Sequence, residues 1–468
     1  IYIGLVGPKG WIQWDGIKQG AELARNLIND AGGMVDSEGK THEVLFVEID
    51  ESIPWVPRPP IWEELLAALD AYPTMQFLIG GFFGECVFPM REAAMDYAAV
   101  NGRPIWIITG ASSDELIDDG PQKDNPYDDV REDYERYKYM FRSSPFNTTT
   151  YLNALVAFLR DQVLPQKLVP LYGSPVKTYI IAEDLIWCDG IVEGLQGGAL
   201  GTQANIVGIG RPSAIELDFA PFLDMIEDSG AKLIIHIFST VAGPYFIWKW
   251  GERKVPAVPV GINFESGERL VYRNEAGWEC EYETTLCVGA RTNINPDAKP
   301  LSAEAFWDEY RARYGHAPIY TAWGAYDAII ALNETAAQWI GKNCSWIIPN
   351  VMEPTSRDSL LGHFKYTDHH DVYCDPFSTT PVWPPAGWPG TPTSTIGTVR
   401  PLVAQWQVGR LEVVWPRGYK PAPGSESPEA LWNSTSLPFA RKWKIPPWMY
   451  SLAETDFAGG SLIPRPPI

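Results

Sequence analysis

Two short loops place small residues beside hydroxyl and acidic side chains, a combination that can hold a compact polar ligand. One loop spans residues 80–86 and includes Gly84 and Glu85; the other spans residues 110–113 and includes Ser112 and Ser113. We expect each loop to follow a strand and to precede a helix, where hydroxyl groups and free backbone N–H groups favour a carboxylate. The alternative is two ordinary connections between strands and helices.

The segments around these loops predict one strand–helix–strand unit. Residues 76–79 and 105–108 are apolar runs with β-forming side chains, and apolar residues recur at helical spacing between them. Pro89 fits the first turn of that helix and Gly102 follows its end. Such a unit closes right-handed into a parallel sheet. Both loops therefore lie at the carboxyl edge, where open α/β sheets bind ligands.

The whole chain extends this alternation into two halves. Residues 1–115 alternate strand and helix, with residues 7–16 as a loop after the first strand, and predict a parallel sheet with helices on both faces. A second alternation starts at residue 150, with strands at 178–182, 205–208, 232–237 and 257–260. Residues 118–138 predict a surface insertion and residues 402–415 a final hairpin. The fold class is therefore α/β, with two doubly wound lobes.

Composition narrows the class of partner. The 468 residues carry a net charge of −21, which argues against binding nucleic acid or an anionic membrane surface. No apolar run reaches the roughly 20 residues of a membrane span. The 20 tryptophans indicate either heavily packed cores or an aromatic binding surface.

Motifs for catalysis and for metals are absent from the sequence. No G-x-G-x-x-G, P-loop, G-x-S-x-G or H-E-x-x-H pattern occurs, so we expect no cofactor and no enzymatic activity. The run from Asp368 to Asp371 holds two adjacent histidines, but these need not share a face and no third ligand accompanies them. We therefore expect no metal site.

The six cysteines lack a C-x-x-C pair. Cys280 and Cys287 are seven residues apart and suggest a closed hairpin-like loop. Cys344 and Cys374 would close a loop of about 30 residues, which is worth roughly 3 kcal/mol. We expect this second pair to be oxidised if the protein is exported.

Several strings in order resemble solute-binding proteins of ABC importers of the branched-chain amino-acid type. They are QWDGIKQGAELARNLINDAGG after the first strand, FLIGG, PIWIITGASSDEL, YMFRSSPFNTTTYLNALVAFL and YTAWGAYDAIIAL, and the resemblance covers about residues 1–416. It implies two Rossmann-like lobes that are joined by three hinge crossovers and close on a ligand as a venus flytrap. Lobe one would be 1–142 plus 265–399, lobe two 143–264 plus 400–416, and residues 417–468 an extended C-terminal tail.

The same resemblance implies a biological role. The protein would be a monomer outside the cytoplasm, extracellular or periplasmic and membrane-tethered in its precursor. It would deliver a small solute, an amino acid or an aromatic or apolar carboxylate, to an ABC permease in the membrane. The alternatives are a sensor ectodomain of the same fold, or a binder of a neutral amide or sugar.

The candidate ligand-binding residues come from both lobes. Ser112 and Ser113, with the Ala111 backbone, would grip an acid group, and Glu85 would face a cationic group. Aromatic side chains from both lobes would cover the ligand body. By resemblance, two residues that open a late helix and three that end lobe-two strands also face the cleft. Besides those already named, the candidates are Trp14, Phe82, Phe83, Gly84, Trp187, His236, Ser239, Asn263, Tyr320 and Trp323.

Two departures from the family pattern concern the ligand. Trp187 and Cys188 stand where the family often has a Tyr-Gly pair, and Phe82, Phe83 and Glu85 replace serines that commonly hold the ligand carboxylate. The scaffold is unaffected, whereas the specificity for amino acids is open.

Overall fold

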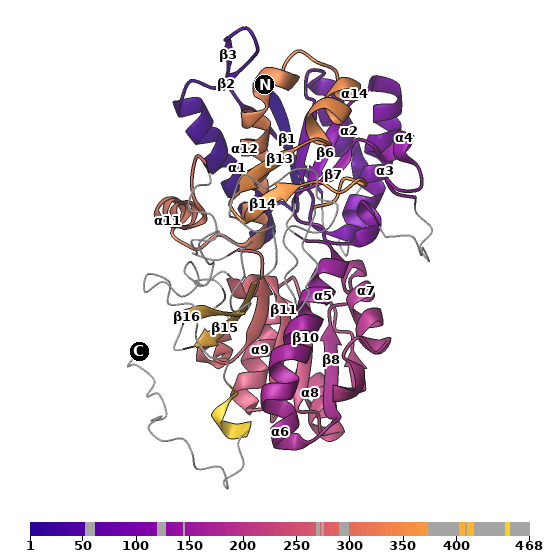
Figure 1. The fold of residues 1–468 in the computed structure, drawn as a ribbon, viewed down its shortest axis with the longest axis vertical. Helices are drawn as coiled ribbons and strands as arrows, with labels where there is room; N and C mark the ends of the chain where they lie inside the picture. Colours follow the sequence, from indigo (N-terminus) through magenta and orange to yellow (C-terminus); the bar gives the residue numbers. More distant parts are fainter. Residues whose placement is uncertain are drawn as a thin grey trace, which may run out of the picture.

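The computed structural model describes residues 1–51, 61–118, 128–143, 146–267, 272, 276–289, 299–372, 402–407, 410–415 and 445–449. Two α/β lobes lie one above the other along the long axis of the molecule (Figure 1). This arrangement confirms the predicted fold class. Of the three predicted crossovers, the one near residues 397–401 lies outside the described residues.

Lobe one is built on a five-stranded sheet in which all neighbours are parallel. In spatial order its strands are β4 (Leu45–Asp50), β1 (Tyr2–Gly7), β5 (Phe77–Gly80), β6 (Ile105–Ile108) and β7 (Met140–Arg142). The three inner strands are apolar and almost wholly buried, as expected for strands that helices cover on both sides. The main helices are α1 (Ile12–Asp30), α2 (Trp62–Ala71), α3 (Gly84–Asn101), α11 (Ala303–Tyr314) and α12 (Tyr320–Glu334).

Helices α1 and α12 pack unusually closely, although 289 residues lie between the end of one and the start of the other. A Cβ atom added at Gly20 would lie 2.3 Å from the carbonyl oxygen of Ala322, and one at Gly16 would lie 2.2 Å from Thr321 Oγ1. Only glycine permits this approach. The contact fixes the N-terminus of α12, which begins with Tyr320.

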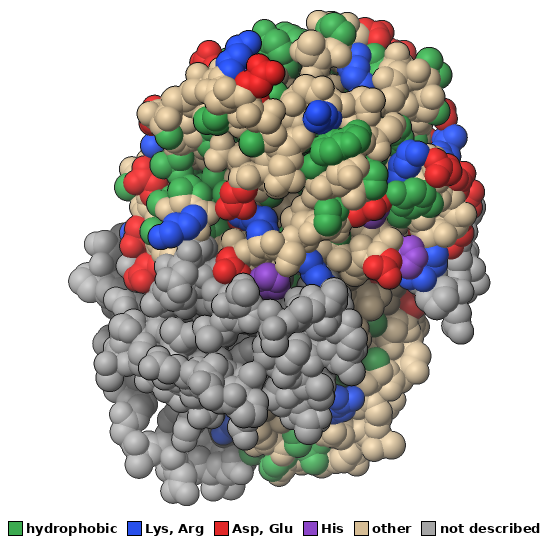
Figure 2. All heavy atoms as spheres, turned by 45° about the horizontal axis from the view of Figure 1, so that its top comes forward, with side chains coloured by type: hydrophobic (Ala, Val, Ile, Leu, Met, Phe, Trp, Pro, Cys, Tyr) green, Lys and Arg blue, Asp and Glu red, His purple; other side chains and the backbone are tan. Residues whose placement is uncertain are grey.

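The remaining elements of lobe one are short. They are β2 (Met34–Val35), β3 (Thr41–His42), η1 (Asp114–Leu116), α4 (Tyr134–Tyr137), α13 (Ala336–Trp339), α14 (Cys344–Ile347), η6 (Ile348–Met352), β13 (Ser356–Ser359) and β14 (Gly362–Lys365). On the face that Figure 2 shows, acidic and basic side chains are interspersed over lobe one.

Lobe two is built on a seven-stranded sheet. In spatial order its strands are β16 (Arg410–Trp415), β15 (Leu402–Gln407), β12 (Thr284–Cys287), β11 (Val258–Asn263), β10 (Leu233–Phe238), β8 (Val176–Ala182) and β9 (Ala204–Gly210). The last five are parallel, and β15 and β16 form the predicted antiparallel hairpin.

Two hydrophobic clusters cover the two faces of this sheet. Ile180 and Ala182 belong to one cluster and Ile181 to the other, as the two-residue repeat of a strand requires. Helices α5 (Thr148–Phe158) and α7 (Ile186–Gln196) supply the first face, and α8 (Ala220–Ser229) and α9 (Ala242–Arg253) the second. The other named elements are η2 (Leu159–Leu168), α6 (Val169–Tyr172), η3 (Gly201–Gln203), η4 (Phe264–Gly267), η5 (Gly277–Cys280) and η7 (Pro447–Met449).

Two sequence-based expectations are wrong. Strand β12 pairs with β11, so residues 284–287 lie in the sheet of lobe two and not in lobe one, where the predicted boundary placed them. Cys287 is a buried free thiol, so it does not pair with Cys280 to close a loop. Cys344 is also a buried free thiol, and its predicted partner Cys374 lies outside the described residues.

The two histidines of the Asp368–Asp371 run serve local packing and polar contacts. His370 stacks on Phe141 with ring centroids 4.0 Å apart, and its Nδ1 lies 3.0 Å from the carbonyl oxygen of Met140. His369 Nδ1 lies 3.3 Å from Asp118. Within the described ranges no cluster of three metal-binding side chains occurs, and no helix there has the length and apolarity to cross a bilayer.

Candidate ligand site

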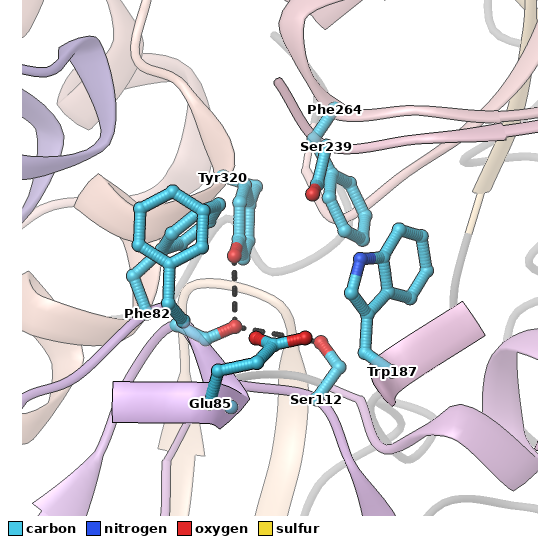
Figure 3. A pocket seen from close by; sticks show the side chains of 10 residues that line it. Phe82, Glu85, Ser112, Trp187, Ser239, Phe264 and Tyr320 are labelled. Carbon is cyan, nitrogen blue, oxygen red and sulfur yellow. Dashed lines mark hydrogen bonds between the residues drawn. The ribbon is translucent and has the colours of Figure 1, made fainter. Parts of the chain in front are cut away.

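A pocket lies between the lobes at the carboxyl ends of strands from both sheets (Figure 3). Its empty volume is about 230 Å³. That space includes volume open to solvent, so a ligand would fill only part of it. The lining residues are Phe82, Phe83, Gly84, Glu85, Gly110, Ser112, Trp187, Ser239, Phe264 and Tyr320.

Aromatic rings connect the two lobes across this pocket. Phe264, directly after β11, stacks on Tyr320 of lobe one with centroids 4.3 Å apart and on Trp187 of lobe two with centroids 5.3 Å apart. Phe82 meets Phe83 edge to face at 4.7 Å and lies 5.9 Å from Tyr320. The walls are therefore mainly ring surfaces, and a ligand would lie against them.

Glu85 is the one charged side chain among the pocket residues. It lies in the first turn of α3 in lobe one, and its Oε1 accepts the backbone N–H of Ile186, the first residue of α7 in lobe two, at 2.8 Å. Its Oε2 is buried without a hydrogen-bond partner among the described residues. Burial raises the pKa of Glu85, and the Ile186 N–H acts in the opposite direction.

The serine loop after β6 is held from behind by Arg142. This guanidinium donates to the carbonyl oxygens of Ala111 and Ser113 at 2.6 Å each, and its Nε lies 3.1 Å from Asp371. Ser112 lines the pocket, and its hydroxyl has a long contact of 3.4 Å with the carbonyl of Gly110. The hydroxyl of Ser113 is buried without a partner among the described residues.

A carboxyl group in each lobe occupies the backbone N–H groups of a loop at the pocket. Glu51, after β4, accepts the N–H groups of Phe82 and Phe83 at 2.8 and 2.9 Å. Glu183, after β8, accepts the N–H groups of Ser239 and Thr240 at 2.8 and 2.9 Å and also both of their hydroxyls.

Burial acts against the ionised form of both groups. It raises the pKa of Glu51 to about 8 and that of Glu183 to about 7, while the hydrogen bonds from the loops oppose the shift. These N–H groups are therefore already bonded within the protein.

Gln13 links the lobes beside the pocket. Its Nε2 donates to the carbonyl of Ser239 at 2.9 Å and to Glu265 Oε1 at 3.1 Å, so that one buried amide of α1 touches lobe two and the second crossover. Sequence analysis did not predict this role, because the side chain lies in the stretch 7–16 that was predicted to be a loop.

No protein-family model and no curated protein matches the sequence. Solved structures do match it. A solute-binding protein of an ABC transporter from Rhodopseudomonas palustris in complex with benzoate is 16% identical, with a TM-score of 0.64 over 88% of this chain and 95% of that one. LivJ of Streptococcus pneumoniae, in complex with isoleucine, is 17% identical, with a TM-score of 0.63 over 89% of this chain and 99% of that one. The chain has the fold of ABC-transporter solute-binding proteins.

A third structure agrees with this assignment of the fold. The leucine-binding protein LivK of Thermotoga maritima is 13% identical, with a TM-score of 0.61 over 88% of this chain and 97% of that one. The resemblance that the sequence suggested is thus confirmed for the solute-binding fold.

Within this solute-binding fold, the pocket brings together eight of the fourteen predicted residues. They come from three loops and three helix starts of both lobes, and are Phe82, Phe83, Gly84, Glu85, Ser112, Trp187, Ser239 and Tyr320. Ala111 and Ser113 lie beside it in the serine loop without lining it.

The other four predicted residues lie elsewhere. Trp14 is inside α1, which begins at Ile12 and not after residue 16, and its ring packs on the end of β1 at Gly7. Trp323, three residues after Tyr320 in α12, packs against Phe306 and is not among the residues that line the pocket.

His236 and Asn263 belong to a buried polar cluster of lobe two. The amide of Asn263 donates to Glu283 Oε1 at 2.9 Å, and Nε2 of His236 lies 3.3 Å from the same oxygen. They stabilise the sheet and do not line the pocket.

Two pocket residues were missed. Phe264 directly follows Asn263, a predicted residue, and a search for aromatic side chains at strand ends would have found it. Gly110 contributes its backbone: its carbonyl oxygen accepts a hydrogen bond from the hydroxyl of Tyr320 at 2.8 Å. Such a backbone role cannot be predicted from the type of residue.

Proposed function

We propose that this protein is the solute-binding component of an ABC importer and that it works outside the cytoplasm, in the periplasm or at the cell surface. It captures a small organic solute between its lobes and presents it to a membrane permease. The observation that supports this role is a pocket lined from both lobes, in a fold shared with solute-binding proteins.

Capture would work by closure. A ligand in the pocket contacts Glu85, Ser112 and Tyr320 of lobe one and Trp187 and Ser239 of lobe two. Because such a ligand binds both walls only when they are close, it favours the closed state by its difference in affinity for the two states. The hydrogen bonds from Gln13 and from Ile186 across the cleft add to the same closed state.

The proposed ligand is small and has an apolar body. An amino acid or an aromatic acid is the class that the sequence favours, and the matched structures contain isoleucine and benzoate. The hydroxyl of Ser112 and the Trp187 indole N–H, which is buried without a hydrogen-bond partner in the described part of the chain, are donors for a carboxylate or a carbonyl. Each ring contact would add about 0.5–1.5 kcal/mol beyond area burial.

We further propose that the ligand is bound and released without chemical change. The pocket residues include no pairing of a nucleophile with a base. Ligand recovered after long incubation with the protein should therefore be intact, as mass spectrometry would show. A product whose amount grows with protein concentration would contradict this proposal.

Small-angle scattering and thermal unfolding test the receptor role together. A panel of amino acids, aromatic acids, amines, amides and sugars is screened for an increase in Tm, and each hit is examined by scattering. We expect at least one hit that also lowers the radius of gyration, and we expect Trp187→Ala to abolish both effects. Trp346→Ala is the matched control, because Trp346 is exposed and remote from the pocket. A panel without hits would count against the receptor role.

A further inference from the structure

We infer that the ligand carries an alkylated ammonium group, which lies between Glu85 and the aromatic rings of the pocket. This inference rests on the proposed solute-binding function and narrows its ligand class. Tetramethylated or trimethylated nitrogen compounds, with or without a carboxylate elsewhere, share this chemistry.

The charge of the pocket is the first support. Glu85 is the only charged residue among those that line it, and its Oε2 has no hydrogen-bond partner within the described residues. Asp184 and Asp189 of lobe two add negative charge near Glu85, with Arg211 between them at 3.5 and 2.6 Å. A cation would complete this arrangement, whereas an isolated buried carboxylate is costly.

The rings are the second support. The faces of Trp, Tyr and Phe carry negative electrostatic potential and attract a cation within about 6 Å, most strongly when water is excluded. Trp187, Phe264 and Tyr320 supply three stacked rings at one wall, and Phe82 supplies another beside Tyr320 (Figure 3). Rings and one carboxylate together form the kind of cage that binds alkylated ammonium groups.

The backbone gives the third support. The N–H groups of Phe82, Phe83, Ser239 and Thr240, which would otherwise face an anionic ligand, donate to Glu51 and Glu183. A carboxylate ligand would have the Ser112 hydroxyl and the Trp187 indole N–H as donors in place of these backbone groups, and it would meet Glu85.

The number of free hydrogen-bond acceptors in the pocket favours an alkylated nitrogen over a primary ammonium. The carbonyl of Gly110 already accepts two hydroxyls, from Tyr320 and Ser112, and Glu85 Oε1 accepts Ile186 N–H. Glu85 Oε2 is the carboxylate oxygen that stays available. A primary ammonium has three N–H donors, and each one buried without an acceptor costs about 1–3 kcal/mol. A fully alkylated nitrogen has none.

Calorimetry on the full chain tests the inference with tetramethylammonium, choline and glycine betaine. The controls are benzoate, isoleucine and the carbon isostere of choline, in which carbon replaces the charged nitrogen. We expect at least one of the three ammonium compounds to bind about tenfold or more tightly than each control, a difference of about 1.4 kcal/mol. Tighter binding of glycine betaine than of choline would indicate that the ligand also has a carboxylate, and the opposite order would indicate that it has none.

Two variants and one control variant show which residues determine the affinity for the ammonium compounds. Glu85→Gln removes the charge but keeps a side-chain oxygen that can accept Ile186 N–H, so it should weaken ammonium binding about tenfold while leaving the isostere unaffected. The control Glu252→Gln removes an exposed charge on α9, outside the pocket lining, and should change affinity by less than about twofold. Phe264→Leu keeps an apolar contact without a ring face and should weaken the ammonium compounds more than the isostere.

The outcomes are distinguishable. If the isostere or an acid binds as tightly as the ammonium compounds, or if Glu85→Gln has no effect on them, the ammonium assignment is wrong while the receptor role stands. If none of these compounds and no member of the wider panel binds, both the assignment and the receptor role are overturned.

Discussion

The two lobes have the same glutamate–loop arrangement at the pocket, but the side chains around it differ. In each lobe a glutamate after a strand accepts the N–H groups of a nearby loop: Glu51 in lobe one and Glu183 in lobe two. In lobe one the loop residues are Phe82 and Phe83, whereas in lobe two they are Ser239 and Thr240. The hydroxyls of lobe two are thus used to hold its own glutamate, and the rings of lobe one remain for a ligand.

The difference also changes the chemistry of the two carboxyl groups. Both are completely buried, but Glu183 has two hydroxyl donors in addition to two N–H groups, and Glu51 has only the N–H groups. Donors stabilise the ionised form, and the pKa is raised to about 7 for Glu183 but to about 8 for Glu51. The additional donors favour ionisation of Glu183, and the negative charges of Asp50 and Glu85 act against ionisation of Glu51.

Removing Glu183 should have the largest effect on stability. Glu183→Leu leaves two buried N–H groups and the Ser239 hydroxyl without their acceptor, whereas the Thr240 hydroxyl can still donate to the carbonyl of Ala214. We expect the free energy of unfolding to fall by about 3–5 kcal/mol. Chemical denaturation measures it. Glu252→Leu, an exposed site on α9, is the control and should change stability by less than about 0.5 kcal/mol.

Removing Glu51 should cost less, because only two donors lose their acceptor. We expect Glu51→Leu to lower the free energy of unfolding by about 2–4 kcal/mol, with Glu48→Leu as the control on the same strand. An equal or larger loss than for Glu183→Leu would mean that the hydroxyls of Ser239 and Thr240 contribute nothing.

Stability should fall as the pH rises through the range in which these groups ionise. For both, the pKa in the folded protein lies above the ordinary value of 4.5. Their contribution is therefore fully present below that value and is lost as the pH rises through about 7 for Glu183 and about 8 for Glu51.

Thermal unfolding between about pH 5 and about pH 9 checks the order of these two losses. Glu183→Gln should flatten the part of the Tm profile near pH 7, and Glu51→Gln the part near pH 8. The reverse assignment would contradict the explanation by donor number.

The smallest effect is expected where the lobes meet. Gln13→Ala removes the hydrogen bonds to Ser239 and Glu265 and should weaken ligand binding by about 0.5–1.5 kcal/mol, since a closed state loses this support. Gln76→Ala, whose amide bonds to the carbonyl of Lys342 within lobe one, is the control for affinity. Equal effects of both variants would show that Gln13 does not link closure to binding.

The sequence predicted the scaffold well because periodicity and loop position report on local structure. The alternation of apolar strands with helices was sufficient to place the loops of Gly84 and Ser112 at one edge. It failed at Trp14, because the helix begins at Ile12, within the stretch 7–16 that was predicted to be a loop, so the ring packs on the end of β1.

The partners of the pocket loops were harder to predict. Glu51 and Glu183 each stand directly after a strand, which is visible in the sequence, but their partners lie 31 and 56 residues away. Gln13 reaches across 226 residues to Ser239. Such contacts depend on how the lobes pack, and no local pattern encodes them.

The close approach of α1 and α12 means that specificity can evolve from outside the pocket. Tyr320 begins α12, and the position of that helix is set by Gly16 and Gly20, neither of which lines the pocket. A methyl group at either glycine would push α12 away and carry the Tyr320 ring with it. Homologues that bind different solutes through identical pocket side chains would then differ at these two hidden positions.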